Sequence, residues 1–137
     1  MIAYVDTSVL LRVVLQQPNA LKEWGAITRG VSSILMRVEA QRSLDRLYLA
    51  AELNAEEYVA KQIEVRQALE TFILTPLDER TLDIAAEPAT HRLRTLDTLH
   101  LVTALRYRAT ARIDVFATHD TALATAARAS GFAILGA

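Results

Sequence analysis

The chain has 137 residues with 15 basic and 16 acidic side chains, a formal net charge of −1 and no cysteine. The balanced charge argues against a simple basic nucleic-acid-binding protein, and the lack of cysteine excludes disulfides, iron–sulfur clusters and thiolate zinc sites. Since 52% of the residues are hydrophobic and 23% are charged, we expect a single compact domain over residues 1–137. No apolar run approaches the ~18 residues of a membrane span and the N-terminus lacks a basic signal region, so we expect a cytoplasmic protein.

The N-terminal segment predicts a buried strand that runs into a helix. Residues 2–5 form a short apolar run with β-branched and aromatic members, typical of a strand buried on both faces of a parallel sheet. Asp6, Thr7 and Ser8 follow, three N-cap residue types in a row, and an apolar helical segment continues over residues 9–15. In an open α/β sheet, ligands bind at the carboxyl ends of strands. Asp6 is therefore either a site residue or only the N-cap of this helix.

The next part of the chain predicts a short helix, a strand and a helical hairpin. The short helix covers residues 20–29 and ends at Gly30, and a strand over residues 31–34 runs into a long helix over residues 35–51. A capping box at Asn54 opens a second long helix that extends to about residue 72. Apolar residues expected to face inward are Met36, Ala40, Leu44, Leu47 and Ala51 on the first helix, and Tyr58, Val59, Ile63 and Leu69 on the second.

The C-terminal half continues the alternation of strands and helices. In order, we expect a strand over 72–77 at a sheet edge, a short helix over 78–86, a basic irregular segment over 89–94, a buried helix beginning near 96, a strand over 114–118, an Ala-rich helix ending at Gly131, and a strand over 132–135. Strands that alternate with helices imply a three-layer α/β fold with a parallel sheet.

Four acidic residues stand where a buried core does not favour them: Asp6, Glu39, Asp97 and Asp120. Two unit charges about 4 Å apart repel by about 4 kcal/mol at an effective dielectric constant of about 20, so a cluster of carboxylates requires cations. An all-oxygen donor set with open positions selects Mg²⁺ or Mn²⁺. Such a metal activates water and stabilises charge on a transferring phosphoryl group. The pattern favours metal-assisted phosphodiester hydrolysis.

Each of these acids also has a structural interpretation. Asp97 and Asp120 are each able to cap the helix that they open. Glu39 is able to pair with Arg42, three residues further along an exposed helix face. His100, three residues after Asp97, is more often a satisfied core histidine than a metal ligand. The coincidence of all the acids acting as caps and ion-pair partners is the less favoured interpretation.

Several other polar residues accompany the acids. The hydroxyls of Ser8 and Thr118 are candidates for hydrogen bonds that support the carboxylates. Arg42 and Arg46 lie on the same predicted helix face as Glu39 and are candidates for substrate binding, because guanidinium groups contact phosphate in bidentate fashion. Asp83 and Asp114 are most simply interpreted as solvated.

These motifs, taken together and in this order, resemble the PIN domain, and specifically the VapC-like toxins of toxin–antitoxin systems. The segments that carry the resemblance are Asp6-Thr7-Ser8 after an apolar strand, Ser32-Ser33-Ile34 with Val38-Glu39, Leu96-Asp97-Thr98-Leu99-His100-Leu101-Val102-Thr103-Ala104, and Ala117-Thr118-His119-Asp120 followed by Ala126-Ala127 and Gly131-Phe132. Each motif alone is weak, but the ordered set covers nearly the whole chain. His119 is a departure, since a small residue is more usual between Thr118 and Asp120.

The resemblance implies a Rossmann-like sheet of strand order 3-2-1-4-5, flanked by helices and an α-hairpin. It implies Mg²⁺- or Mn²⁺-dependent endoribonuclease activity, with the family's acidic positions at Asp6, Glu39, Asp97 and Asp120 and its hydroxyl positions at Ser8 and Thr118. It also implies a homodimer and a small cognate antitoxin whose side chain, often Arg, enters the acidic pocket. From the residues we expect a partner groove on the hairpin, lined also by Leu11, Val14, Leu15 and Trp24; the alternative is that these residues complete the core.

Two other functions compete with this interpretation. A catalytically silent PIN-type scaffold that binds RNA or protein would be favoured by loss of an acid, and none is missing. An aspartyl phosphotransferase with Asp6 as nucleophile expects a second Asp two residues later, where this chain has Ser8, and a Lys near the phosphate. The only lysines, Lys22 and Lys61, lie mid-chain on polar helix faces. The sequence does not identify the RNA.

Overall fold

A computed structural model describes residues 1–88 and 92–137, so part of the predicted basic segment 89–94 lies outside the described residues. Five strands form one sheet in the order β3-β2-β1-β4-β5, and every neighbouring pair is parallel. The strands are β1 (Ile2–Val5), β2 (Arg29–Ser33), β3 (Phe72–Thr75), β4 (Val115–Ala117) and β5 (Ile134–Leu135). The predicted α/β class and strand order are confirmed, with β1 at the centre and β3 at an edge.

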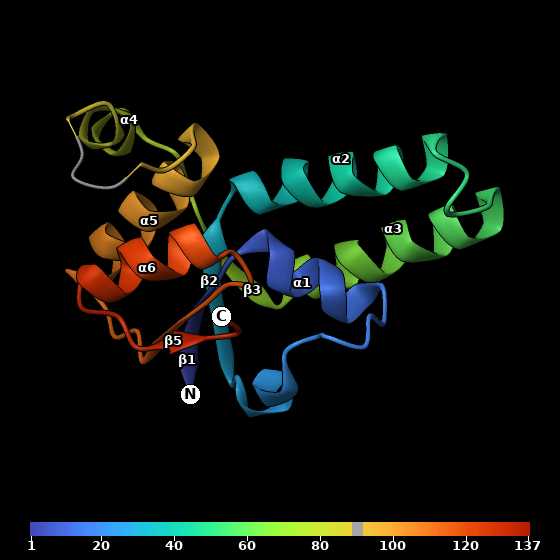
Figure 1. Cartoon of the computed structure of the whole chain (residues 1–137), viewed down its shortest axis with the longest axis horizontal. Helices are drawn as coiled ribbons and strands as arrows, with labels where there is room; N and C mark the ends of the chain where they lie inside the picture. The colour runs from blue at the N-terminus through green and yellow to red at the C-terminus, as the bar shows by residue number, and fades with distance from the viewer. Residues whose placement is uncertain (89–91) are drawn as a thin grey trace.

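Helices cover both faces of this sheet and make three layers (Figure 1). The helices are α1 (Thr7–Val14), α2 (Leu35–Leu49), α3 (Ala55–Glu70), α4 (Glu79–Ala85), α5 (Thr95–Arg108) and α6 (Thr121–Ala129). One core cluster joins the sheet to α1, α2 and α3, and a second joins it to α5 and α6, while α4 packs on α5. Among the described residues, no helix is long and apolar enough to cross a membrane.

Strand β1 supplies side chains to both cores, as its uninterrupted apolar sequence predicts. Ala3 and Val5 belong to the core on the α1–α3 side, whereas Tyr4 points into the core on the α5–α6 side. All three are completely buried, and the Tyr4 ring stacks on Phe116 of β4 with centroids 4.9 Å apart. Full burial of an apolar side chain the size of Val5 contributes about 1.5–3 kcal/mol. The strand is thereby held in the middle of the molecule, with its carboxyl end at the site described below.

Helices α2 and α3 form the predicted hairpin, which extends away from the sheet (Figure 1). The capping box is confirmed: the Asn54 side chain accepts from the Glu57 N–H at 2.8 Å, and Glu57 accepts from the Asn54 N–H at 3.1 Å. The inward assignment of two α3 residues is wrong, because Val59 is 52% exposed and Ile63 is 46% exposed. At 100° per residue, both lie about 100–140° from the buried face that runs through Tyr58, Val65 and Leu69.

The segment between α1 and β2 also differs from the prediction. Only Lys22–Ala26 is helical, as a short 3₁₀ turn (η1), and Gly30 lies inside β2 rather than at a helix end. Gly30 allows close packing there, since a Cβ at this position would lie 2.6 Å from the Phe72 ring of β3 and the ring would have to shift. Asp114, expected to be solvated, instead accepts a hydrogen bond from the Ile2 N–H at 2.8 Å and pairs with Arg112.

Candidate active site

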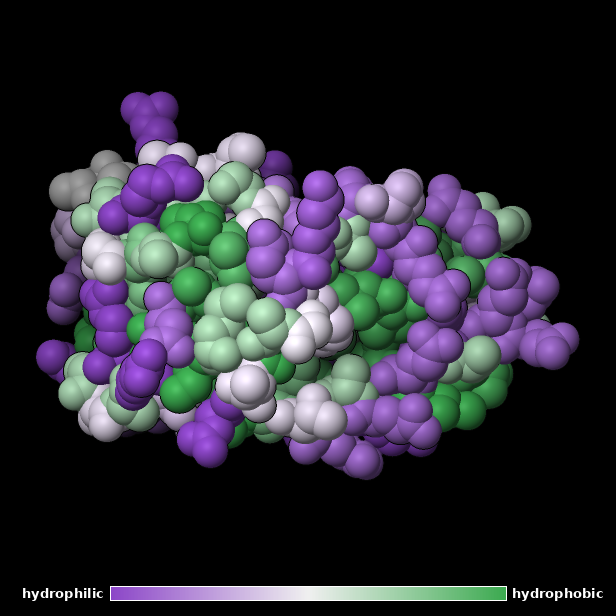
Figure 2. All heavy atoms as spheres, turned by 90° about the horizontal axis from the view of Figure 1, so that it is seen from below, coloured by the Kyte–Doolittle hydropathy of each residue, from purple (hydrophilic) through white to green (hydrophobic). Residues whose placement is uncertain are grey.

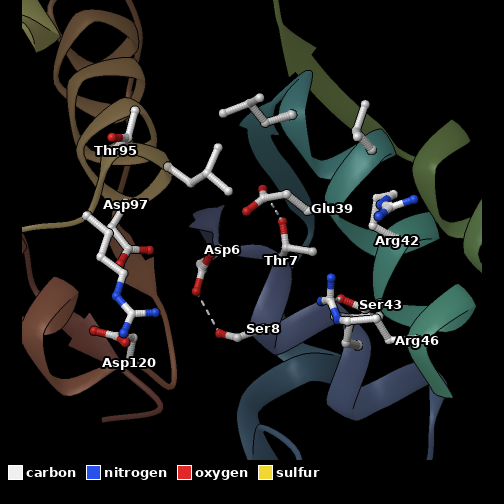
Figure 3. A pocket seen from close by; sticks show the side chains of 15 residues that line it. Asp6, Thr7, Ser8, Glu39, Arg42, Ser43, Arg46, Thr95, Asp97 and Asp120 are labelled. Carbon is white, nitrogen blue, oxygen red and sulfur yellow. Dashed lines mark hydrogen bonds between the residues drawn. The ribbon is translucent and has the colours of Figure 1, made fainter. Parts of the chain in front are cut away.

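The candidate site lies at the carboxyl ends of β1 and β4. Strand β1 pairs with β2 on one side and β4 on the other. The chain runs from β1 through β2 to β3 on one side and then crosses over to β4 and β5, so the strand order reverses between β1 and β4. Such a switch point opens a crevice in which open α/β sheets bind ligands. A pocket of about 820 Å³ occupies this place, and its lining includes Asp6, Thr7, Ser8, Glu39, Arg42, Arg46, Arg94, Asp97 and Asp120. The four predicted acids face this pocket from both sides (Figure 3).

Asp6 is nearly buried, and its side chain is held by two hydroxyls rather than by the helix that it precedes. It occupies the N-cap position of α1, yet within the described chain its carboxylate makes no capping hydrogen bond. Its Oδ2 instead accepts from Ser8 Oγ at 2.6 Å and from Thr118 Oγ1 at 3.0 Å. The capping interpretation of Asp6 is therefore wrong, and both predicted supporting hydroxyls contact it.

Glu39 extends from α2 toward Asp6 and is also held through one oxygen. Its Oε1 accepts from Thr7 Oγ1 at 2.9 Å and lies 2.6 Å from Nε2 of His100. The alternative interpretation of Glu39, an ion pair with Arg42, is wrong, because no salt bridge between the two is found among residues 1–88 and 92–137. One oxygen of Glu39 is thus occupied by two donors, and its Oε2 has no hydrogen-bond partner in the described part of the chain.

His100 is the residue whose role sequence reasoning missed. It is completely buried, as expected for a satisfied core histidine, and its Nδ1 lies 2.8 Å from the Tyr4 hydroxyl. Its other nitrogen, however, contacts a site carboxylate and lies 3.8 Å from Oδ1 of Asp6. The three-residue spacing from Asp97 was the available signal, since residues three apart share one helix face.

The two remaining acids belong to the opposite side of the pocket. Asp120 is the N-cap of α6, as its structural interpretation predicts, because its Oδ1 accepts from the Leu123 N–H at 2.7 Å. That bond occupies one oxygen and leaves Oδ2 for other partners. Asp97 lies in the first turn of α5 and is not its N-cap, a position taken by Arg94. No hydrogen bond to the Asp97 carboxylate is found among the described residues.

The electrostatics show that the acids influence one another. Burial, and next the charges of Asp120 and Asp6, raise the pKa of Asp97 above its ordinary value. For His100, burial alone would lower the pKa, but the hydrogen bond to Glu39 and the nearby charge of Asp6 raise it overall. An imidazole between two carboxylates offsets part of their repulsion. The acids of the pocket therefore repel one another, and a bound cation would reduce this repulsion.

The donor set has the chemistry of a site for a hard divalent cation. All four acids supply oxygen. In Asp6, Glu39 and Asp120, one oxygen accepts hydrogen bonds from the protein and the other has no hydrogen-bond partner among the described residues. No group of three or more acidic or histidine side chains in the described segments is drawn together closely enough to form a ready-made ligand shell. The residues fit Mg²⁺ or Mn²⁺ by donor type and charge.

Three arginines line the same pocket and are exposed at its rim. Arg42 and Arg46 come from α2, as the sequence predicts, and the Arg46 guanidinium donates to Ser43 Oγ at 2.9 Å. Arg94, at the start of α5, was not among the predicted substrate-binding residues. Figure 3 shows Arg42 and Arg46 on the Glu39 side of the pocket. Carboxylates inside a pocket with guanidinium groups at its edge match the charge of a phosphodiester and its counter-cation.

Comparisons with known proteins agree with this geometry. The model of the PIN domain family matches residues 3–129 of the chain. Ribonuclease VapC46 of Mycobacterium tuberculosis (strain ATCC 25618 / H37Rv) is 31% identical to this chain, and the alignment covers 96% of this chain and 95% of that protein. Ribonuclease VapC47 of Mycobacterium tuberculosis (strain CDC 1551 / Oshkosh) is 26% identical over 136 residues, covering 94% of this chain and 92% of that protein.

Proposed function

The chain belongs to the PIN-domain family, and from that premise we propose that it is an Mg²⁺- or Mn²⁺-dependent endoribonuclease that hydrolyses phosphodiester bonds. The observation that carries the proposal is the pocket itself, where Asp6, Glu39, Asp97 and Asp120 face one another beneath a rim of arginines. Two relatives of nearly the same length carry the name ribonuclease. Their names support RNA, rather than another phosphodiester, as the substrate.

Asp6, Glu39, Asp97 and Asp120 are the residues that would hold the metal. When bound, Mg²⁺ or Mn²⁺ supplies an activated water and offsets negative charge on the phosphoryl oxygens. Ser8 and Thr118 hold the Asp6 carboxylate so that Oδ1, rather than Oδ2, is left for other partners. The Leu123 N–H does the same for Asp120 by occupying Oδ1.

The arginines at the rim bind the polyanion. Arg42, Arg46 and Arg94 are exposed beside the acids, where they are able to contact phosphates on either side of the scissile bond. These contacts orient the backbone without reading base sequence. These arginines therefore do not by themselves select the RNA.

The test is cleavage of an end-labelled single-stranded RNA by the purified chain, with a DNA oligonucleotide of the same sequence as control. We expect cleavage of RNA with Mg²⁺ or Mn²⁺, and none after exhaustive chelation. Asp97→Asn should be inactive, and Asp83→Asn, which changes an exposed acid outside the pocket, should be as active as the wild type. RNA cleavage that persists through chelation would overturn the assignment of the acids as metal ligands.

The structure gives less support to the two competing functions. For an aspartyl phosphotransferase, the position two residues after Asp6 holds Ser8, which donates to the candidate nucleophile. Lys61 is committed to the Val14 carbonyl at 2.8 Å and to Glu64, away from the pocket. A silent scaffold is the less favoured of these functions because the four acids proposed as metal ligands all line one pocket. The cleavage assay separates the silent scaffold from the nuclease.

We further propose that the chain is the toxin of a toxin–antitoxin pair and that the hairpin contributes the partner surface. Tyr48, Leu49, Val59 and Ile63 are large exposed apolar residues of α2 and α3. Figure 2 shows apolar side chains exposed between polar ones from the centre of one face toward the hairpin end. The other residues expected in this groove contribute less, since Leu11, Leu15 and Trp24 pack against the core and Val14 is buried in it.

The partner assignment is tested by co-expression with the protein encoded beside this chain. We expect a small protein to co-purify and to suppress cleavage, and Leu49→Asp with Ile63→Asp to prevent both effects. Leu82→Asp, at an exposed apolar residue of α4, is the matched control. If no partner co-purifies or inhibits, the toxin role is contradicted while the nuclease proposal stands. Size-exclusion chromatography with light scattering of the isolated chain tests the expected homodimer.

A further inference from the structure

We propose that His100 is a positioning residue that, supported by Tyr4, fixes the carboxylate of Glu39 in the orientation needed to receive the metal. This inference rests on the proposed function, in which Glu39 is one of the metal ligands. It adds a buried hydrogen-bonded chain, Tyr4–His100–Glu39, that links the middle of the central strand to the pocket. Within the described part of the chain, His100 is not among the residues that line the pocket, and its one hydrogen bond to a site acid is the bond to Glu39.

The first observation is the convergence of two donors on a single oxygen. Nε2 of His100 lies 2.6 Å from Oε1 of Glu39, and Thr7 Oγ1 donates to the same oxygen at 2.9 Å. An ionised carboxylate has no hydrogen to give, so the nitrogen must be the donor of the first bond. Two donors on one oxygen restrict rotation of the carboxylate, and they leave Oε2 as the oxygen able to bind a cation.

The second observation is the support of the imidazole from behind. The Tyr4 hydroxyl lies 2.8 Å from Nδ1 of His100, and the two rings meet edge to face at 76° with centroids 5.9 Å apart. A hydroxyl is able to donate to a neutral Nδ1 or to accept from a protonated one, so the chain of bonds persists in either state of the ring. Both residues are completely buried, so bulk solvent does not reach this hydrogen bond.

The third observation is the location of the donor between two acids. The same Nε2 lies 3.8 Å from Oδ1 of Asp6, beyond hydrogen-bonding distance but close enough for attraction. The N–H of His100 thus offsets part of the repulsion between Glu39 of α2 and Asp6 at the end of β1, and so favours their close approach. Loss of this donor would leave Glu39 with Thr7 alone, and the carboxylate would be free to rotate away from Asp6. Partners behind metal ligands commonly change metal affinity by about 10- to 100-fold.

The alternative is that His100 contributes only to core packing. Thr103 provides the matched control, because it lies one turn along the same helix, is 1% exposed, and donates to the Leu99 carbonyl rather than to a site acid. A packing role predicts that Thr103→Val and His100→Leu lower stability without changing metal affinity. A positioning role predicts that only the His100 variant changes metal affinity.

The first measurement is made on the metal-free protein and does not depend on catalysis. Long-range ¹H–¹⁵N NMR spectra should show a proton on Nε2 of His100 that exchanges slowly with solvent. Its resonance should move on Glu39→Gln and on Tyr4→Phe, and should stay in place in Thr103→Val. The inference would be overturned if Nε2 carried no proton, or if the chemical shift of its proton were the same in Glu39→Gln as in the wild type.

The second measurement is Mn²⁺ affinity by titration calorimetry, followed by cleavage of the RNA substrate. We expect His100→Leu to weaken Mn²⁺ binding about 10-fold or more. His100→Gln, whose amide N–H reaches close to the position of Nε2, should recover part of the loss, and Tyr4→Phe should show a smaller effect. If His100→Leu does not fold, the Mn²⁺ affinities of His100→Gln and Tyr4→Phe test the inference.

The outcomes separate this inference from the function on which it rests. If the wild type neither binds Mn²⁺ nor cleaves RNA, the proposed function fails and the positioning role fails with it. If the wild type binds and cleaves, and the His100 and Tyr4 variants keep wild-type affinity, only the positioning role is overturned. Weaker binding in the His100 variants with unchanged binding in Thr103→Val supports the inference.

Discussion

The two sides of the acidic pocket are built differently. The fixed wall, formed by Asp6 and Glu39 at the ends of β1 and within α2, has four side-chain donors on two carboxylate oxygens. The open wall, formed by Asp97 and Asp120 on α5 and α6, has one backbone donor among the described residues, on Asp120. Burial, and next the charges of Asp120 and Asp6, raise the pKa of Asp97 on this wall.

This difference indicates that the two pairs of acids have different roles in the site. Carboxylates restrained by several hydrogen bonds are oriented before any ligand arrives, which lowers the entropic cost of binding. Carboxylates without such bonds are able to adjust, and they carry the unrelieved repulsion of the cluster. We therefore expect variants of the fixed wall to lose function chiefly through lost geometry, and variants of the open wall to show changes in stability as well.

The largest expected effect comes from the fixed wall. Asp6→Asn should reduce RNA cleavage by more than about 100-fold, because loss of a ligand should exceed the 10- to 100-fold effect of an outer partner. The melting temperature of the metal-free variant should be unchanged or higher, since Asn keeps an acceptor for Ser8 and Thr118 while one charge is removed. Cleavage kinetics and calorimetry measure the two effects. Unfolding of the variant with metal binding intact would show that Asp6 is structural.

The second effect is stabilisation by metal across both walls. Because an ion would bind the folded cluster alone, Mg²⁺ or Mn²⁺ at 100 times its dissociation constant should add about 2.7 kcal/mol to the free energy of unfolding. Chemical denaturation with and without the metal measures this increment. This increase in the free energy of unfolding should be lost in Asp6→Asn. It should be retained in Asp83→Asn, because Asp83 is an exposed acid on α4. An equal increment in both variants would place the metal elsewhere.

A smaller effect is expected for Asp120 of the open wall. Asp120→Asn should lower cleavage by about 10-fold while leaving stability close to that of the wild type, because Asn and Asp are comparable N-caps. Asp120→Ala should lose about 1 kcal/mol of stability in addition, since the Leu123 N–H loses its acceptor. Comparison of the two variants separates the capping oxygen from the oxygen that faces the pocket. Full activity in Asp120→Ala would remove this residue from the site.

The smallest expected effect is on the pH dependence of the stability of the metal-free chain. Since the pKa of Asp97 is raised from 3.8 in the folded state, the folded chain binds this proton more tightly than the unfolded chain does. Stability should therefore fall as pH rises from below 3.8 through the raised pKa. Asp97→Asn should remove this fall and be more stable than the wild type at neutral pH, by up to about 1 kcal/mol. Denaturation at several pH values tests this, and a less stable variant at neutral pH would contradict it.

Much of the architecture follows from local patterns in the sequence. The apolar run of β1, the capping box at Asn54 and the alternation of strands with helices predict the elements and their parallel order, because period-2 and period-3.6 patterns act over a few residues. Parallel strands share one carboxyl edge, so acids that follow strands, such as Asp6 and Asp120, are brought together by the topology alone. The ends of the elements are less well predicted. For example, the helix predicted over residues 20–29 is only a 3₁₀ turn at Lys22–Ala26.

What the tertiary structure decided is which groups touch one another. Glu39 and His100 are 61 residues apart, and no local pattern distinguishes a histidine that bonds a site acid from one that merely fills a core. Likewise, the side of α3 that is buried is set by its packing on α1, α2 and β3, which buries Val65 and leaves Val59 and Ile63 exposed. The sequence by itself determined the elements and the acids at the strand ends. The packing of helices on the sheet determined which carboxylate oxygens are held and which are left for a cation.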